Sequence, residues 1–282
     1  FSEFARRMNG GRFSVARGLS SSDAAKLRGA LGDYLLRGGY MATLDLPASD
    51  GMMLMQEYAY RTVAMDVVER YNLRTPQIAA SFLNRCIASS GRELSVNKVV
   101  NEYKSRGAST SRETLSNLLS YYEEAYLVFS LGDLSRSLAD NPRSSSKVYA
   151  VDPGMFTAFS RAASKEQGQR LETAVFNKLR RVAPQARSGS LARLTFEHEG
   201  SLHEVDFVMG DALLGDMFEL VQVSIDLANP KTRRRELAAL EAAMEKYGVR
   251  ESTVVTMDSE ETVEMSSGTV RIVPAWKWLL DE

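Results

Sequence analysis

Two runs of the sequence are the most informative about its fold, Glu204-Val205-Asp206-Phe207-Val208 and, soon after it, Phe218-Glu219-Leu220-Val221-Gln222-Val223-Ser224. Both runs are short and apolar, which predicts two consecutive β-strands. Because side chains alternate between the two faces of a strand, Gln222 and Ser224 share a face with Asp226, while Glu219 points to the opposite side. The two runs therefore place one acid, Asp206, opposite a polar residue of the next strand.

An acid at the end of one strand, opposite a polar residue of the next, is how nucleases of the restriction-endonuclease type hold a divalent metal ion. Such a site needs two or three oxygen ligands around Mg2+ and a lysine near the attacking water. The candidate ligands are Asp206, Gln222 and Glu172, which lies on the predicted helix before the strands. Gln222 brings a neutral oxygen, and Ser224 stands where a lysine is expected. We interpret Glu172, Asp206 and Gln222 as vestigial catalytic and metal-binding residues.

Two groups of neighbouring residues leave a working nuclease open as an alternative. Glu204 shares the face of Asp206 and is a further candidate ligand, although an exposed strand end explains it equally well. Lys231, or one of the arginines Arg233–Arg235, could supply the missing cation by swinging in from the next helix. Neither group forms a motif, so these residues permit catalysis without predicting it.

Length and composition limit the other possibilities. With 282 residues the chain has room for two or three domains, and its 44% hydrophobic and 25% charged residues are typical of a globular protein. The net charge of -1 means that nucleic-acid binding would need a local basic patch. Cys86 is the single cysteine, which excludes an intrachain disulfide, and with two histidines the sequence argues against structural zinc. No apolar run approaches about 18 residues, so we expect a cytoplasmic protein without membrane contact.

The chain reads as three successive segments. Residues 1–72 have helical periodicity, and residues 73–152 contain helices followed by two strands. Residues 153–282 alternate between the two, which predicts a mixed α/β sheet covered by helices. The elements expected in this last segment are helices near 166–182, 232–247 and 276–280 and strands near 192–197, 202–209, 217–225, 252–257 and 270–273.

The middle segment has the element order of a winged helix: a helix, a helix-turn-helix, and a two-stranded ribbon. Thr110-Ser111-Arg112-Glu113 is a capping-box sequence with Thr110 as the expected cap. The outward face of the helix that it starts, together with the wing, would offer side chains suited to phosphate or base edges. These candidate DNA-binding residues are Arg112, Ser116, Asn117, Ser120, Arg136 and Arg143. Glu113, Glu123 and Glu124 on the same helix would repel phosphate, so protein docking is the competing interpretation.

Seven sequence words, in order over nearly the whole chain, resemble one family. They are residues 34–40 (YLLRGGY), 70–74 (RYNLR), 114–125 (TLSN and YYEEA), 147–154 (KVYAVDPG), 171–176 (LETAVF), 204–208 (EVDFV) and 274–278 (PAWKW). The chain is similar to the bacterial and archaeal AAA+ ATPases that carry a C-terminal restriction-endonuclease-like domain of unknown function (domain of unknown function 4143). The resemblance implies a helical lid (1–72), a winged-helix domain (73–152) and a restriction-endonuclease-like α/β domain (153–282).

The chain departs from this family at its beginning. The family's ATPase core needs a Gly-rich loop ending in Lys-Ser or Lys-Thr, and neither Gly10-Gly11 nor Gly210–Gly215 has that spacing or the lysine. We therefore expect the lid and C-terminal portion of such an ATPase. ATP would bind only to the full-length parent, and Mg2+ is the one ion that this portion would take.

The expected function is recognition of DNA or of a protein partner, with a degenerate nuclease-like domain. The expected partners are DNA, the missing ATPase core and further subunits. Two alternatives stay open, an active Mg2+-dependent DNA endonuclease and a protein-interaction module without DNA binding.

Overall fold

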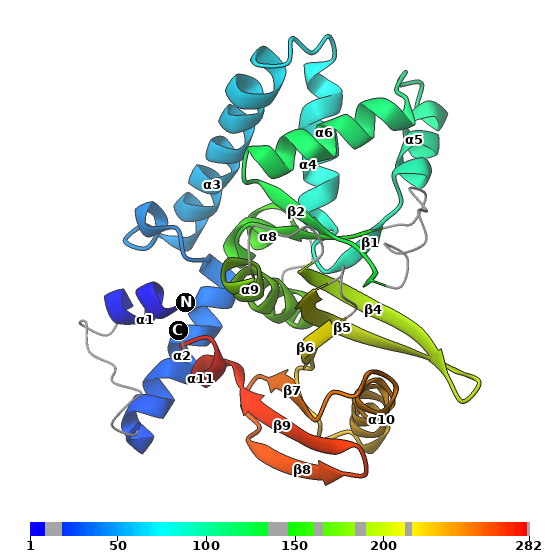
Figure 1. Cartoon of the computed structure of the whole chain (residues 1–282). Helices are drawn as coiled ribbons and strands as arrows, with labels where there is room; N and C mark the ends of the chain where they lie inside the picture. Colours follow the sequence, from blue (N-terminus) through cyan, green and yellow to red (C-terminus); the bar gives the residue numbers. More distant parts are fainter. Residues whose placement is uncertain (9–18, 135–145, 161–165, 184–189, 212–215, 281–282) are drawn as a thin grey trace. The chain divides into compact units, whose positions relative to one another are not determined.

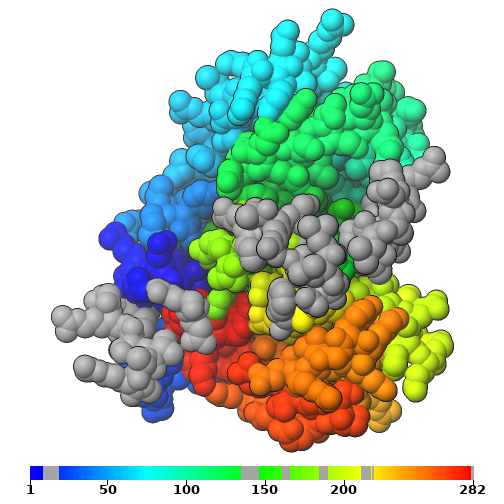
Figure 2. Space-filling model, in the orientation of Figure 1, coloured from blue at the N-terminus to red at the C-terminus, as the bar shows by residue number. Residues whose placement is uncertain are grey.

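A computed structural model describes residues 1–8, 19–134, 146–160, 166–183, 190–211 and 216–280 (Figures 1 and 2). The helices are α1 (Ser2–Met8), α2 (Ser21–Arg37), η2 (Met41–Thr43), α3 (Ala48–Thr62), η3 (Val63–Glu69), α4 (Pro76–Ala88), α5 (Val96–Ser105), α6 (Arg112–Glu124), α8 (Pro153–Phe159), α9 (Gln167–Val182), α10 (Pro230–Tyr247) and α11 (Ala275–Trp278). The strands are β1 (Arg92–Leu94), β2 (Val128–Leu131), β3 (Ser146–Ala150), β4 (Leu191–His198), β5 (Ser201–Asp211), β6 (Asp216–Val223), β7 (Glu251–Thr256), β8 (Glu261–Met265) and β9 (Gly268–Pro274). The predicted α/β class is confirmed.

The chain divides into two compact units. The six-stranded unit consists of residues 1–35, 132–142 and 174–282, and the three-stranded unit consists of residues 36–131 and 143–173. Both segment boundaries expected from the sequence, at residues 72/73 and 152/153, fall inside the three-stranded unit. The reason is packing: Val67 of η3, Phe82 of α4 and Phe156 of α8 belong to one hydrophobic core.

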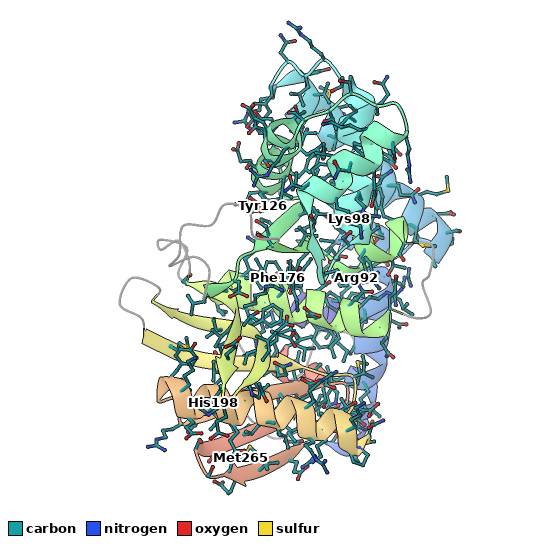
Figure 3. The ribbon with its side chains drawn as sticks, turned by 90° about the vertical axis from the view of Figure 1, so that its right-hand side faces the viewer. Arg92, Lys98, Tyr126, Phe176, His198 and Met265 are labelled. Carbon is teal, nitrogen blue, oxygen red and sulfur yellow. The ribbon has the colours of Figure 1, made fainter. Side chains whose placement is uncertain are left out.

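The six-stranded unit is built on a mixed sheet with the strand order β4-β5-β6-β7-β9-β8. The first three strands are antiparallel, β7 runs parallel to both β6 and β9, and β8 returns antiparallel at the edge. Leu240 of α10 shares a core with Leu220 of β6 and Val254 of β7. Phe207 of β5 instead meets Phe176 of α9, with 6.2 Å between the ring centroids. Phe176 is labelled in Figure 3. The structure confirms the expected mixed sheet flanked by helices.

The three-stranded unit contains a small antiparallel sheet with the strand order β1-β3-β2. Along the chain its elements follow the order α4, β1, α5, α6, β2, β3, so a short strand joins the expected helices and ribbon. The expected cap of α6 was wrong by one residue. Ser111, not Thr110, has the extended backbone of a cap, and its hydroxyl accepts a hydrogen bond from the backbone N–H of Thr114 at 3.0 Å.

A buried acid joins the end of α2 to the start of α8 in the three-stranded unit. Asp152 caps α8 by accepting from the backbone N–H of Gly154 at 2.7 Å, and it accepts from that of Gly39 at 2.8 Å. Burial raises the pKa of Asp152 above its ordinary value, while the hydrogen bonds from these two N–H groups oppose that rise. A methyl group at Gly154 would lie 2.3 Å from the carbonyl oxygen of Arg37, so the close approach of the two helices requires glycine there.

None of the helices in the described part of the chain is long and apolar enough to cross a membrane.

Candidate functional site

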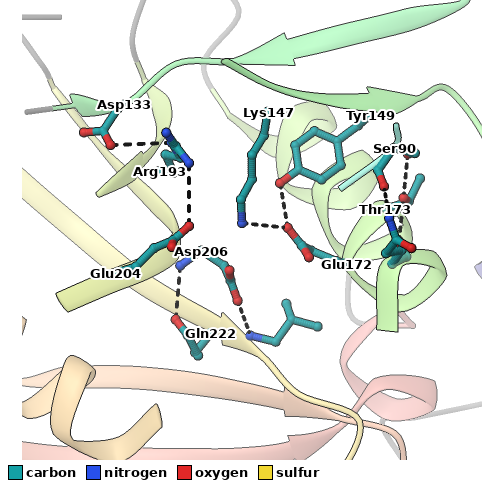
Figure 4. A network of polar contacts seen from close by, with 12 residues as sticks. Ser90, Asp133, Lys147, Tyr149, Glu172, Thr173, Arg193, Glu204, Asp206 and Gln222 are labelled. Atoms are coloured by element: carbon teal, nitrogen blue, oxygen red, sulfur yellow. Dashed lines mark hydrogen bonds and ion pairs between the residues drawn. The ribbon is translucent and has the colours of Figure 1, made fainter. Parts of the chain in front are cut away.

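Strands β5 and β6 diverge at Asp206 and Gln222. Their regular pairing ends at Phe207 and Val221. Beyond that pair, side-chain oxygens accept the hydrogen bonds between the two strands. The backbone N–H of Asp206 donates to Gln222 Oε1 at 3.1 Å, and the backbone N–H of Val223 donates to Asp206 Oδ2 at 3.0 Å (Figure 4). The structure thus brings together two of the three residues that the sequence singled out.

The amide of Gln222 is engaged at both ends. While its oxygen accepts from Asp206, its Nε2 donates to Glu236 Oε2 of α10 at 2.6 Å. Gln222 and Glu236 are only 7% and 5% exposed. The other oxygen of Glu236 forms an ion pair with Arg235, whose side chain is 74% exposed. The hydrogen bond to Glu236 is the main reason that the pKa of Arg235 is raised, and the negative charges of Asp206 and Glu204 add to it.

Glu236 did not emerge from the sequence as a site residue. It follows three arginines, Arg233–Arg235, and looks like part of a solvated charge run. The available clue was periodicity, because Glu236 falls on the same helical face as the buried residues Leu237 and Leu240. A carboxylate on a buried helix face needs polar partners, and here they are Gln222 and Arg235.

Glu204 takes part in a neighbouring ion-pair chain. Arg193 of β4, which is 3% exposed, lies 3.7 Å from Glu204 Oε1 through Nη1 and 3.5 Å from Asp133 Oδ2 through Nε (Figure 4). Asp133 is equally buried and forms an isolated β-bridge with Arg193. Glu204 therefore balances a buried arginine, a role that its position at a strand end did not reveal.

Glu172 belongs to the three-stranded unit, whereas Asp206 and Gln222 belong to the six-stranded unit. The Oε1 atom of Glu172 accepts from Lys147 Nζ at 3.1 Å and from the Tyr149 hydroxyl at 2.8 Å. The side chains of Lys147 and Glu172 are 11% and 16% exposed, so the ion pair is largely shielded from water. Lys147 and Tyr149 are two apart on β3 and share a strand face, which was the signal in the sequence that they act together.

The described residues contain no preformed cluster of metal ligands of the expected kind. Within the described residues, no group of three or more His, Cys, Asp or Glu side chains is arranged to hold an ion. Two of the cations that could have swung in have partners: Arg233 pairs with Glu261 at 2.8 Å, and Arg235 pairs with Glu236. The Ser224 hydroxyl donates to the backbone oxygen of Asp226 at 2.9 Å.

The outward face of α6 is polar, as the sequence predicts. Arg112, Asn117 and Ser120 are exposed and Ser116 is half-buried. Arg136 and Arg143, the expected wing arginines, lie outside the described residues.

Two of the three acids on α6 have partners of their own. Glu123 Oε1 accepts from the backbone N–H of Ser130 at 2.7 Å, and Glu124 accepts from the hydroxyl of Tyr71. Each carboxylate is thereby tied to a neighbouring part of the unit. Both donors are neutral, so these contacts fix the two carboxylates without adding a positive charge that would oppose the expected repulsion of phosphate.

Comparison with known proteins gives two matches. A family described as a domain of unknown function (DUF8612) matches residues 28–166, which include α6 but not β5, β6 or α10. The chain is also similar to the uncharacterized protein MJ1544 of Methanocaldococcus jannaschii, at 31% identity over 287 residues. This alignment covers 99% of the chain and 61% of the relative, so the chain spans less than two thirds of that relative's length. No solved structure matches.

Proposed function

We propose that this chain recognises nucleic acid through a winged helix, and that its nuclease-like sheet no longer cleaves. Support for the first part comes from the element order α4, β1, α5, α6, β2, β3 and the strand order β1-β3-β2. In a winged helix the last helix before the ribbon enters the major groove. Here that helix is α6, whose exposed Arg112 and Asn117 suit phosphate and adenine contacts.

The observation that carries the second part is the state of Gln222. A metal-dependent nuclease needs free oxygen lone pairs that converge on the ion. The side-chain oxygen of Gln222 is already bound by the Asp206 N–H, and one oxygen of Asp206 is bound by the Val223 N–H. The strand ends thus satisfy each other, which favours a retained fold over a working metal centre.

Recognition is tested by fluorescence anisotropy with a labelled DNA duplex over a range of salt concentrations. Binding through phosphate contacts weakens as salt rises, because each contact releases counterions. Arg112→Gln should lower the slope of log affinity against log salt by about 0.9. Arg74→Gln removes an exposed arginine outside α6 and should leave the slope unchanged.

Salt-insensitive binding, or no binding by the parent, would contradict the proposal and favour a protein-docking module. Membership of the AAA+ ATPases stays a prediction from the seven sequence words. Within that prediction, the chain would supply the DNA-contacting part of a longer ATPase.

A further inference from the structure

One face of α10 carries a row of three cations. Lys231, Arg234 and Arg235 occupy positions i, i+3 and i+4, and all three are exposed, so they are neighbours on one outward strip of the helix. Figure 3 draws this helix in pale orange. Ala238, one turn further along the same strip, is also exposed and adds no bulk beside them. The opposite face of α10 is buried and includes Leu237 and Leu240.

The fold accounts for only one member of this row, Arg235, which pairs with Glu236. The start of a helix is the positive end of its dipole, where acids are favourable and cations unfavourable, yet the first turn of α10 contains no acid. Within the described part of the chain, the side chains of Lys231 and Arg234 have no polar partner. Charges that oppose the helix and form no contact with the fold are better explained by something that they bind.

Arg235 is anchored as well as exposed. Its guanidinium forms an ion pair with Glu236, which is 5% exposed and held on its other side by Gln222. This anchor restrains the direction of the guanidinium, while 74% of the Arg235 side chain stays accessible. The planar fork of arginine can bind one carboxylate and still present N–H groups to a phosphate oxygen.

The backbone at the start of α10 is already occupied. Asn229 Oδ1 accepts from the N–H groups of Lys231 at 2.9 Å and Thr232 at 3.4 Å, and its carbonyl oxygen accepts from Arg233. A ligand would therefore be held by the side chains of the row and not by the helix end.

We propose that Lys231, Arg234 and Arg235 bind the phosphate backbone of a nucleic acid. From Lys231 to Arg235 the helix rises about 6 Å, at about 1.5 Å per residue. That length is comparable to two phosphate steps along one DNA strand, at about 3.4 Å each. The row has no exposed large apolar side chain on its strip, whereas the centre of a protein interface is apolar and aromatic. The inference rests on the proposed nucleic-acid recognition and adds a second contact surface to it.

The test compares two triple variants that change the net charge equally. Lys231→Gln/Arg234→Gln/Arg235→Gln removes the row, and Lys26→Gln/Arg61→Gln/Arg74→Gln removes three exposed cations elsewhere. Anisotropy with a labelled duplex of about 20 base pairs is measured between about 50 and 200 mM salt. The row variant should lower the slope of log affinity against log salt by about 2 to 3, while the control variant changes it little. Circular dichroism checks that both variants are folded.

The outcomes separate the inference from the proposed function. Equal slopes for the row and control variants, with Arg112→Gln still weakening binding, would refute phosphate binding by the row. The proposed DNA recognition through α6 would be unaffected by that result. A parent that binds no DNA would contradict both. A row variant that binds DNA as the parent does but loses affinity for polyglutamate would assign the row to an acidic protein partner, and so overturn the nucleic-acid assignment.

Discussion

Gln222→Glu is the substitution that most directly probes the hydrogen bonds between β5, β6 and α10. Gln222 Nε2 donates to Glu236 Oε2 at 2.6 Å, and both residues are buried. The substitution replaces that donor by an oxygen, so a second carboxylate faces Glu236. Two like charges about 4 Å apart repel by about 4 kcal/mol at an effective dielectric constant of about 20. The lost hydrogen bond to a charged group adds about 1.5–3 kcal/mol.

Protonation limits this cost and makes it depend on pH. The introduced carboxyl group can take up a proton, and each pH unit above its ordinary pKa of about 4.3 then costs about 1.36 kcal/mol. We therefore expect the variant to lose about 4–5 kcal/mol in the free energy of unfolding at pH 8 and about 1 kcal/mol at pH 5. The introduced carboxyl group has a raised pKa in the folded state, so the variant keeps its stability at low pH and loses it as pH rises.

Urea unfolding of parent and variant at pH 5 and pH 8 measures both values. The control is the exchange variant Gln222→Glu/Glu236→Gln, which keeps one charge and one amide in the pair and should recover most of the lost stability at pH 8. Manganese should also stabilise Gln222→Glu more than the parent, because the variant replaces an amide by a carboxylate beside Glu236 and next to Asp206. A variant as stable as the parent at pH 8, or an exchange that recovers nothing, would refute the hydrogen-bonding scheme.

Three further predictions concern the three-stranded unit and the start of the chain. Gly154→Ala should lower the free energy of unfolding in urea by more than about 2 kcal/mol, because the new methyl group would lie 2.3 Å from a carbonyl oxygen. Gly29→Ala lies in the middle of α2, where a methyl group meets nothing within 4 Å, and should raise that free energy by up to about 1 kcal/mol. Lys147→Met leaves the shielded carboxylate of Glu172 without its cation and should lower the free energy of unfolding by about 3 kcal/mol. In a double-mutant cycle, Lys147→Met/Glu172→Gln should lose less than the sum of the two single losses, because both substitutions remove the same ion pair. Because the pKa of Asp152 is raised in the folded state, ionising its carboxyl group destabilises the fold. The parent should therefore lose stability relative to Asp152→Asn as pH rises above about 4, which urea unfolding of both proteins at several pH values measures.

The sequence predicts the large elements well because their apolar periodicity is strong. The run from Glu204 to Val208 and the run ending at Ser224 are neighbouring strands, and Asp206 meets Gln222 where they part. Strand β8 was not predicted, since Glu261 and Glu264 give an edge strand the composition of a loop. Strand β1 has only three residues and pairs with β3 far along the chain, so no local pattern marks it.

The candidate site was predicted less completely, because its contacts are tertiary. Glu236 lies 14 residues beyond Gln222 along the chain, and only the packing of α10 on the sheet brings the two together. Glu172 looked like a free acid of a leading helix, but Lys147 and Tyr149 of β3 bind it in the folded unit. Which oxygen atoms are already occupied depends on such contacts, and residue types along a sequence do not encode them.

DNA binding without cleavage can be tested on a native gel of supercoiled plasmid incubated with the chain in Mg2+ or Mn2+, with duplicate lanes stripped of protein before loading. We expect retarded plasmid in the native lanes and unchanged supercoiled plasmid after stripping, because the chain binds DNA while the side-chain oxygen of Gln222 and one oxygen of Asp206 accept from backbone N–H groups. Metal-dependent conversion to nicked circles that disappears in Asp206→Ala would contradict this expectation and establish a working nuclease.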